Sequence, residues 1–227
     1  MRAGVKEVGM KPILFNTEMV RAIIDGRKTV TRRIAKEIIP KDLPQALNLK
    51  VVREWGGEKG NTLQKELFFK QPYQVGDTLY VRETWMEWGC RYCEKECYGN
   101  CNPAEYAYRA TGYWDSEEWK WLPSIHMPKE AARIFLKVTD VRVERLQDIT
   151  EEQAIKEGVG DLFLDYIANC PGDKYKVPME HETLVIDQFE LLWNSTIKKQ
   201  DIGKYDWNSN PYVWVIEFER CDKPNEN

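Results

Sequence analysis

Two stretches of apolar alternation place the strongest constraint on the fold of this chain. In residues 134–138, Ile134, Leu136 and Val138 recur at every second position, and residues 213–218 repeat this period of two. A period of two is typical of a β-strand that buries one face. Segments of this kind outnumber the helical ones and do not alternate regularly with them. The sequence therefore predicts an α+β fold with a curved sheet or a small mixed β-barrel, and helices at its periphery.

Capping signals predict where the few helices lie. Thr17 precedes a short apolar helical face, so its hydroxyl is expected to cap a helix that Gly26 ends in a left-handed conformation. A second helix is expected to begin at a capping box in residues 150–153 and to end at Gly158. A third helix is expected around residues 185–192, where apolar residues recur at helical spacing.

Two stretches show neither period and are interpreted as insertions. Residues 35–72 carry several Pro and Gly among mixed charges, which predicts an irregular segment, and residues 86–130 are dense in Cys, Trp and Tyr. We expect a single domain over residues 10–220 that contains both insertions. Residues 1–9 are expected to form a loose extension, and residues 221–227 a tail.

The charge balance limits which partners the chain can attract. Its 33 Lys and Arg residues against 37 Asp and Glu give a formal net charge of −4, so no global positive field recruits polyanions. Any contact with nucleic acid must therefore be local. There is no run of about 18 apolar residues, and Met1–Lys11 is too polar for a secretory signal. We expect a cytoplasmic protein without a membrane partner.

The segment Gly26–Arg33 concentrates basic and hydroxyl side chains directly after a glycine turn. Its composition alone is also that of a solvated strand whose cations discourage edge pairing. Strand alternation would place Thr29, Thr31 and Arg33 on one face and Lys28, Val30 and Arg32 on the other. Lys28 and Thr31 can therefore act together only if the backbone bends just after Gly26.

The pattern Gly26-x-Lys28-x-x-Thr31-x-Arg33 resembles the signature of the ASCH family, a branch of the PUA-like superfamily. Residues 75–77 resemble the family's Gly-Asp turn, and residues 146–158 resemble its short helix ending in Glu-Gly. The resemblance covers about residues 12–34, 75–85, 133–158 and 212–219, outside both insertions. It implies a small PUA-like β-barrel. More narrowly, Arg82-Glu83-Thr84-Trp85 and the Pro123–Pro128 segment resemble prophage-encoded ASCH proteins.

The resemblance also implies an activity and its residues. Family members with a known activity are small bacterial amidohydrolases that remove the acetyl group of N-acetylcytidine, and their Lys, Thr and Glu correspond to Lys28, Thr31 and Glu157. Amide hydrolysis needs a nucleophile, a base and an acid. We expect Thr31 to attack, Lys28 to act as base, and Glu157 to relay protons or orient Lys28, while Arg33 holds a carbonyl, a phosphate or an oxyanion.

Three further residues are candidates for binding a substrate such as a nucleoside or nucleobase. Glu83 and Trp85 lie two apart on one predicted strand, and His126 follows two tryptophans in the second insertion. If these side chains converge on the basic strand, they supply a stacking surface and a titratable group.

Two other functions remain open on the sequence. The first is a non-catalytic module that holds nucleic acid, RNA rather than DNA, through Lys28, Arg32 and Arg33, with Trp85 or Trp121 stacking on a base. The second is an interaction protein of a phage in which the ASCH fold serves only as a scaffold.

Four cysteines lie within twelve residues, at Cys90, Cys93, Cys97 and Cys101. Four thiolates at this spacing suit a structural zinc ion, which would hold together an insertion that is short of apolar core. An iron–sulfur cluster is the main alternative, followed by disulfides or free thiols. Four protein ligands leave no open position, so no catalytic metal is expected. The other two cysteines, Cys170 and Cys221, are interpreted as isolated thiols.

Zinc binding can be tested by metal analysis of the purified chain. We expect about one zinc ion per chain, and its loss in the Cys90→Ser/Cys97→Ser double variant because each substitution removes a thiolate ligand. A Cys170→Ser variant is the matched control and should keep the metal. Iron together with visible absorbance would instead indicate a cluster, and the absence of both metals would contradict the assignment.

Overall fold

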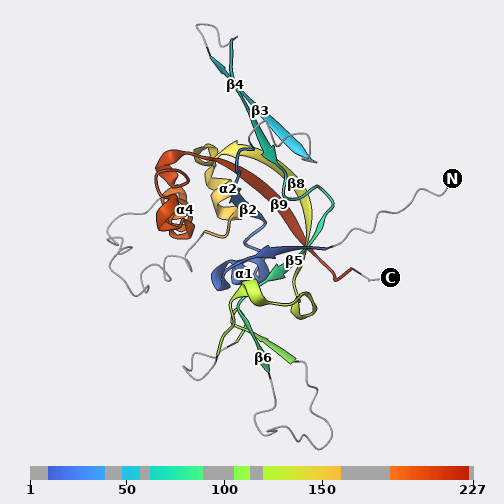
Figure 1. The fold of residues 1–227 in the computed structure, drawn as a ribbon. Helices are drawn as coiled ribbons and strands as arrows, with labels where there is room; N and C mark the ends of the chain where they lie inside the picture. Colours follow the sequence, from blue (N-terminus) through green and yellow to red (C-terminus); the bar gives the residue numbers. More distant parts are fainter. Residues whose placement is uncertain are drawn as a thin grey trace, which may run out of the picture. The chain divides into compact units, whose positions relative to one another are not determined.

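The computed structural model describes residues 10–38, 48–56, 62–88, 105–112, 120–159 and 185–224 (Figure 1). Contacts within the chain divide it into two compact units. Strands β8 (Phe135–Arg145) and β9 (Tyr212–Cys221) each belong partly to one unit and partly to the other. The first unit comprises Met1–Gly26, Asp77–Lys137 and Glu219–Asn227, and the second comprises Arg27–Gly76 and Val138–Phe218.

The first unit is built on three strands and one helix. Strand β1 (Lys11–Leu14) runs parallel to β5 (Thr78–Arg82), and β5 pairs antiparallel with the beginning of β8. Helix α1 (Thr17–Ile24) buries its apolar face. A two-stranded sheet, β6 (Trp85–Trp88) with β7 (Glu105–Tyr108), and two 3₁₀ turns, η2 (Ser124–His126) and η3 (Lys129–Ala131), complete its described elements.

Helix α1 confirms the predicted helix but corrects its cap. The residue before the helix is Asn16, whose side-chain oxygen accepts a hydrogen bond from the Met19 N–H at 2.8 Å. Thr17 is the first helical residue, so the predicted capping role of Thr17 is wrong by one position. Gly26 has φ of +75°, which confirms the predicted left-handed conformation.

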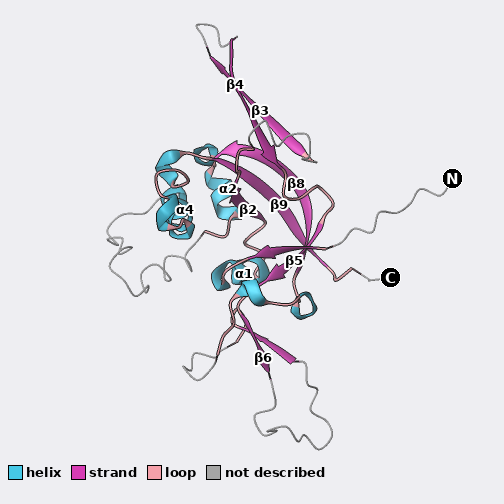
Figure 2. Cartoon of the chain, viewed as in Figure 1, coloured by secondary structure: helices cyan, strands magenta, loops and turns pink. Residues whose placement is uncertain are grey.

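The second unit contains the remaining strands and helices. Strand β2 (Val30–Ile34) pairs antiparallel with β9, which lies between β2 and β8 in the sheet. Strands β3 (Leu49–Gly56) and β4 (Thr62–Lys70) form a separate two-stranded sheet. The helical elements, shown in Figure 2, are α2 (Glu151–Lys156), α4 (Val185–Thr196) and the 3₁₀ turns η4 (Leu146–Asp148), η6 (Lys199–Asp201) and η7 (Trp207–Ser209).

The β3–β4 hairpin overturns the prediction of irregular structure throughout residues 35–72. It is a regular antiparallel pair with one shift of register between Glu54 and Trp55. One face of β4 buries Leu67 and Phe69, which are 4% and 2% exposed, while most of the charged side chains of the two strands are exposed: Lys50, Arg53, Lys65, Glu66 and Lys70. The mixed charges that suggested a loop therefore belong largely to the exposed side chains of a strand pair.

The described chain is a mixed α+β structure with many strands and few helices, as predicted. The predicted helices at residues 150–158 and around 185–192 are present as α2 and α4. Of the described helices, none is both long enough and apolar enough to cross a membrane.

Candidate active site

A short bridge, which lies outside the named strands, joins the segment before β2 to the end of α2. Lys28 and Glu157 form this antiparallel bridge, and the neighbouring Thr29 N–H donates to the Lys156 carbonyl at 2.9 Å. The Thr29 carbonyl in turn accepts from the Phe218 N–H at 2.9 Å, where the pairing of β2 with β9 begins. The backbone thus brings the start of the basic segment against the C-terminus of α2.

Helix α2 positions Glu157 by its two ends. At its start, the predicted capping box is present, because Thr150 and Gln153 exchange hydrogen bonds of 3.3 Å between side chain and backbone in both directions. At its end, Glu157 is the C-cap and Gly158 follows with φ of +87°. The carboxylate of Glu157 is therefore held one residue beyond the helix.

Lys28 and Glu157 form a buried ion pair. The Lys28 Nζ donates to Glu157 Oε2 at 2.7 Å and also to the Glu157 backbone carbonyl at 2.7 Å. Each residue is only 3% exposed. Two hydrogen bonds to one residue fix the direction of the amino group, so the sequence-predicted pairing of these two residues exists as a direct contact.

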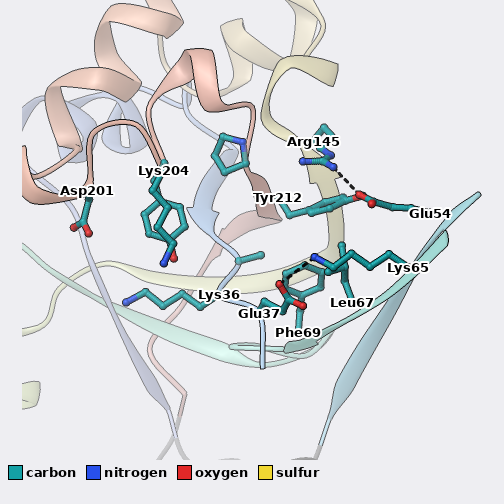
Figure 3. A pocket seen from close by; sticks show the side chains of 13 residues that line it. Lys36, Glu37, Glu54, Lys65, Leu67, Phe69, Arg145, Asp201, Lys204 and Tyr212 are labelled. Carbon is teal, nitrogen blue, oxygen red and sulfur yellow. Dashed lines mark hydrogen bonds and ion pairs between the residues drawn. The ribbon is translucent and has the colours of Figure 1, made fainter. Parts of the chain in front are cut away.

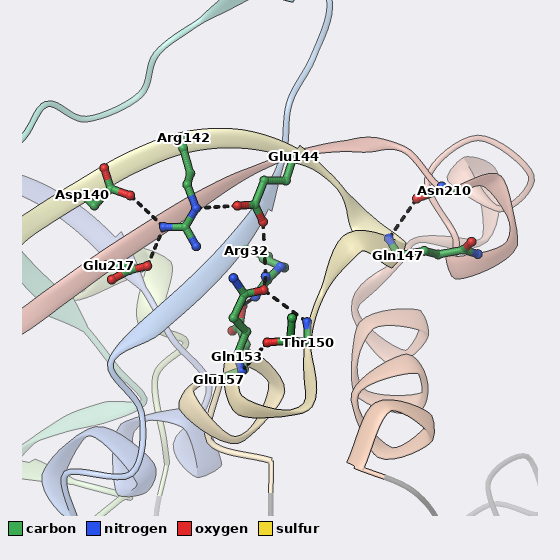
Figure 4. Close-up of polar contacts among 10 residues, drawn as sticks. All are labelled: Arg32, Asp140, Arg142, Glu144, Gln147, Thr150, Gln153, Glu157, Asn210 and Glu217. Carbon is green, nitrogen blue, oxygen red and sulfur yellow. Dashed lines mark hydrogen bonds and ion pairs between the residues drawn. The ribbon is translucent and has the colours of Figure 1, made fainter.

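Arg32 is a third member of this site that the predicted catalytic set omitted. Its Nη1 lies 3.2 Å from Glu157 Oε1, and its Nη2 donates to the Gln153 side-chain oxygen at 2.6 Å (Figure 4). The guanidinium carbon also lies 5.8 Å from the centroid of the Phe189 ring. Strand alternation had placed Lys28 and Arg32 on the same face of the predicted strand. That shared face was the sequence feature that could have indicated Arg32 as a neighbour of Lys28.

Ion pairs connect Arg32 to charged side chains on β8. Its Nη2 is 3.6 Å from Glu144 Oε2, and Glu144 also accepts a hydrogen bond from Arg142. Figure 4 shows Arg142 among Asp140, Glu144 and Glu217, with which it forms ion pairs. Arg32 is 3% exposed, whereas the Glu144 side chain is 23% exposed. Within the deeply buried part, two cations therefore face one carboxylate.

Burial lowers the pKa of the Lys28 amino group below its ordinary value. The loss of hydration is the largest cause and outweighs the attraction and hydrogen bond of Glu157, which raise this pKa, while Arg33 and Arg32 lower it further. A lysine with a lowered pKa gives up its proton more readily near neutral pH than a solvated one. Lys28 thus has a property that a general base requires.

Thr31 and Arg33 lie on β2 itself. Thr31 is 2% exposed and Arg33 is exposed, and alternation assigns both to the face of β2 opposite to that of Arg32. The charge of Arg33 nevertheless acts on the site, because it lowers the pKa of Lys28 and interacts with Glu157. Lys28 precedes β2 and pairs with Glu157. The meeting of Thr31 with Lys28 stays a prediction, as does the substrate-binding role of Arg33.

The remaining predicted substrate-binding residues belong to the first unit. Glu83 is 1% exposed, and both its carboxylate oxygens accept hydrogen bonds of 2.9 Å from Arg133. Trp85 is 4% exposed and packs in a core cluster, whereas His126 lies exposed in η2. Their role in binding a substrate stays a prediction.

The predicted metal ligands Cys90, Cys93, Cys97 and Cys101 lie outside the described residues, and so does Cys170. Cys221 is a free thiol, as predicted. Among the residues that the structure describes, no group of three or more His, Cys, Asp or Glu side chains is arranged to hold a metal ion. The zinc site stays a prediction.

Comparison with known proteins returns no family model, no curated protein and no solved structure that matches the chain.

Because two buried cations share one carboxylate, we expect substitution of Glu157 to destabilise the chain more than substitution of Lys28. Glu157→Gln leaves Lys28 and Arg32 buried without their carboxylate, so we expect the free energy of unfolding to fall by about 3–5 kcal/mol. Lys28→Met removes one desolvated cation but leaves Glu157 Oε2 and the Glu157 carbonyl without their donor, so it should cost about 1–3 kcal/mol, less than Glu157→Gln because Arg32 still pairs with Glu157. Urea unfolding measures both, and equal losses, or a larger loss for Lys28→Met, would contradict this account of the site.

The lowered pKa of Lys28 predicts a pH dependence of stability. Below the ordinary lysine pKa, the unfolded chain binds a proton at Lys28 more readily than the folded chain does, so the contribution of Lys28 to stability rises with pH. We therefore expect the unfolding free energy of the wild type, relative to that of Lys28→Met, to increase from about pH 8 to about pH 10. A difference that is constant or decreasing across this range would refute the lowered pKa.

Proposed function

We propose that this chain is an amidohydrolase that removes the acyl group from an N-acylated nucleoside or nucleobase. The observation that carries the proposal is the buried contact of Lys28 with Glu157, at 2.7 Å, with the pKa of Lys28 lowered by burial. A desolvated lysine held by a carboxylate is able to move a proton during amide hydrolysis. The positions of both residues match those expected from the resemblance to the ASCH family.

The proposal includes membership of the ASCH family and closure of the strands into a PUA-like barrel. It is supported by the positions of two motifs that lie far apart in the sequence. The basic segment after Gly26 leads into β2, the Glu-Gly motif ends α2, and the two meet at the Lys28–Glu157 bridge. A family signature whose separate parts meet in one buried contact is more informative than either part alone.

The first half of the proposed reaction transfers the acyl group to Thr31. The Thr31 hydroxyl oxygen attacks the acyl carbonyl carbon while the uncharged Lys28 amine takes its proton. Arg33 stabilises the negative oxygen of the tetrahedral intermediate. The carbon–nitrogen bond then breaks, and the Lys28 ammonium gives its proton to the departing amine of the nucleoside, which leaves an ester on Thr31.

The second half hydrolyses this ester. Water attacks the ester carbonyl carbon as Lys28 accepts one of its protons, the bond to the Thr31 oxygen breaks, and that oxygen regains the proton from Lys28. The carboxylic acid is released and every group returns to its initial state. Glu157 stabilises the Lys28 ammonium each time it forms, and Arg32 holds the other oxygen of the carboxylate, Oε1, at 3.2 Å.

The burial of the cations argues against the binding of nucleic-acid phosphates by the same residues. Phosphate contacts need cations that reach the surface, but Lys28 and Arg32 are each 3% exposed and both contact Glu157. Of the three cations expected to hold RNA, only Arg33 is exposed. A non-catalytic module built on Lys28 and Arg32 would require these buried contacts to open.

The activity can be tested on N-acetylcytidine by chromatography of the released cytidine. We expect Lys28→Met and Thr31→Val to reduce kcat/KM at least about 100-fold, because each removes a group that moves or receives a proton. Thr31→Ser keeps the hydroxyl and should retain activity. Lys156→Ala, which removes the exposed lysine directly before Glu157, is the matched control and should change kcat/KM by less than about twofold.

Each outcome bears on a separate part of the mechanism. Full activity in both Lys28→Met and Thr31→Val would refute the assignment of the site. Full activity in Thr31→Val alone would show that water, and not Thr31, attacks the substrate. Salt-dependent binding of oligonucleotides by a folded wild type that turns over no acylated nucleoside would favour the binding module.

A further inference from the structure

A separate groove lies between the β3–β4 hairpin and residues 201–212 in the second unit (Figure 3). Its volume is about 850 Å³, within the range of small-molecule sites in proteins. The groove is not lined by Lys28, Thr31 or Glu157. The groove is therefore a different site from the one proposed to carry out hydrolysis.

One face of the hairpin forms a wall of this groove. Glu54 on β3 and Lys65, Leu67 and Phe69 on β4 lie on the same face of the strand pair and all line the groove. Leu67 and Phe69 are buried, and the Phe69 ring centroid is 5.4 Å from that of Tyr212. The groove therefore has an apolar, aromatic base beneath its charged side chains.

Arg145 is held in a fixed position above this base. Its Nη2 donates to Glu54 Oε1 at 2.6 Å, its Nη1 donates to the Asn210 carbonyl at 3.0 Å, and its guanidinium carbon lies 3.9 Å from the centroid of the Tyr212 ring. Tyr212 also donates its hydroxyl to Glu54 Oε1 at 2.8 Å. These contacts fix a planar cation and a carboxylate before any ligand binds, which lowers the cost of ordering them.

Two lysines supply positive charge on the other side of the groove. Figure 3 shows Lys36 and Lys204 on the side opposite to the Arg145–Glu54 pair. Both are exposed, and neither forms an ion pair with any residue in the described part of the chain. Lys204 also lies 5.0 Å from the centroid of the Tyr205 ring, which is partly exposed. Cations and an aromatic ring are thus adjacent at the surface.

We propose that this groove binds a nucleoside phosphate, either free or within a single-stranded nucleic acid. Lys36 and Lys204 contact the phosphate, Tyr205 stacks on the base, and the Arg145–Glu54 pair provides a donor and an acceptor for polar groups of the ring or sugar. An anion without a ring would leave the aromatic surface unused, and an uncharged ring would leave both lysines unused. A phosphorylated planar ring uses both sides of the groove.

Binding can be measured by fluorescence anisotropy with a labelled eight-nucleotide single-stranded RNA, and by calorimetry with cytidine 5′-monophosphate. We expect Lys36→Ala/Lys204→Ala to weaken binding of the RNA at least about tenfold, because two phosphate contacts are lost. Tyr205→Ala should also weaken it by about tenfold, whereas Tyr205→Phe keeps the ring and should bind as the wild type does.

A double variant with the same change of charge controls for non-specific attraction. Lys198 and Lys199 are exposed and do not line the groove, so Lys198→Ala/Lys199→Ala should weaken binding by less than about twofold. Equal weakening by the two lysine pairs would overturn the proposal. So would the absence of binding of either probe by the folded wild type up to about 1 mM. Circular dichroism melting curves establish that each variant is folded.

The two probes distinguish the sources of the ligand. Displacement of the labelled RNA by cytidine 5′-monophosphate supports a free nucleotide, while binding of the RNA without such displacement supports a strand. The result is separable from the proposed hydrolysis, because Lys28→Met should bind the RNA as the wild type does. Conversely, Lys36→Ala/Lys204→Ala should deacetylate free N-acetylcytidine at the wild-type rate.

Discussion

A carboxylate removed from water beside two cations is the interaction on which the second unit depends. Burying any of these charges alone costs several kcal/mol, so Glu157 is tolerated there only because Lys28 and Arg32 contact its two oxygens. The constraint acts on the backbone as well, because the contact requires the segment before β2 to lie against the end of α2. Two parts of the chain separated by more than a hundred residues thus form one local structure.

The same burial explains why the proton affinity of Lys28 differs from that of a solvated lysine. The buried part of the site holds one positive charge in excess, and the carboxylate that could balance it, Glu144, is shared with Arg142. Loss of hydration and then the neighbouring positive charge both lower the pKa of Lys28, although Glu157 raises it. The burial that lowers the pKa of Lys28 therefore also costs stability, and the hydrogen bonds to Glu157 offset part of that cost.

Much of the local structure was predictable because it follows from side chains close in sequence. The capping box at Thr150 and the left-handed conformation of Gly26 are examples. The contact between Lys28 and Glu157 joins distant parts of the sequence and was expected only from the family resemblance. Arg32 was predicted only as a nucleic-acid contact, because its partners Gln153 and Glu157 lie far away in the sequence, in and directly after α2. The β3–β4 hairpin was missed because its charges hide the period, and Asn16 replaced Thr17 because adjacent polar residues compete for one cap.

Helix α2 has only six residues, far fewer than the roughly 12 to 15 that an isolated helix needs in water. Tertiary contacts therefore stabilise it. Ala154 is fully buried, Arg32 donates to Gln153, and Lys28 donates to the Glu157 carbonyl. We therefore expect the helix, the Glu157 carboxylate and Lys28 to open together, which amide hydrogen exchange along α2 can measure. Because burial is the main cause of the lowered pKa, we expect opening of α2 to expose Lys28 to water and to return its pKa toward the ordinary value.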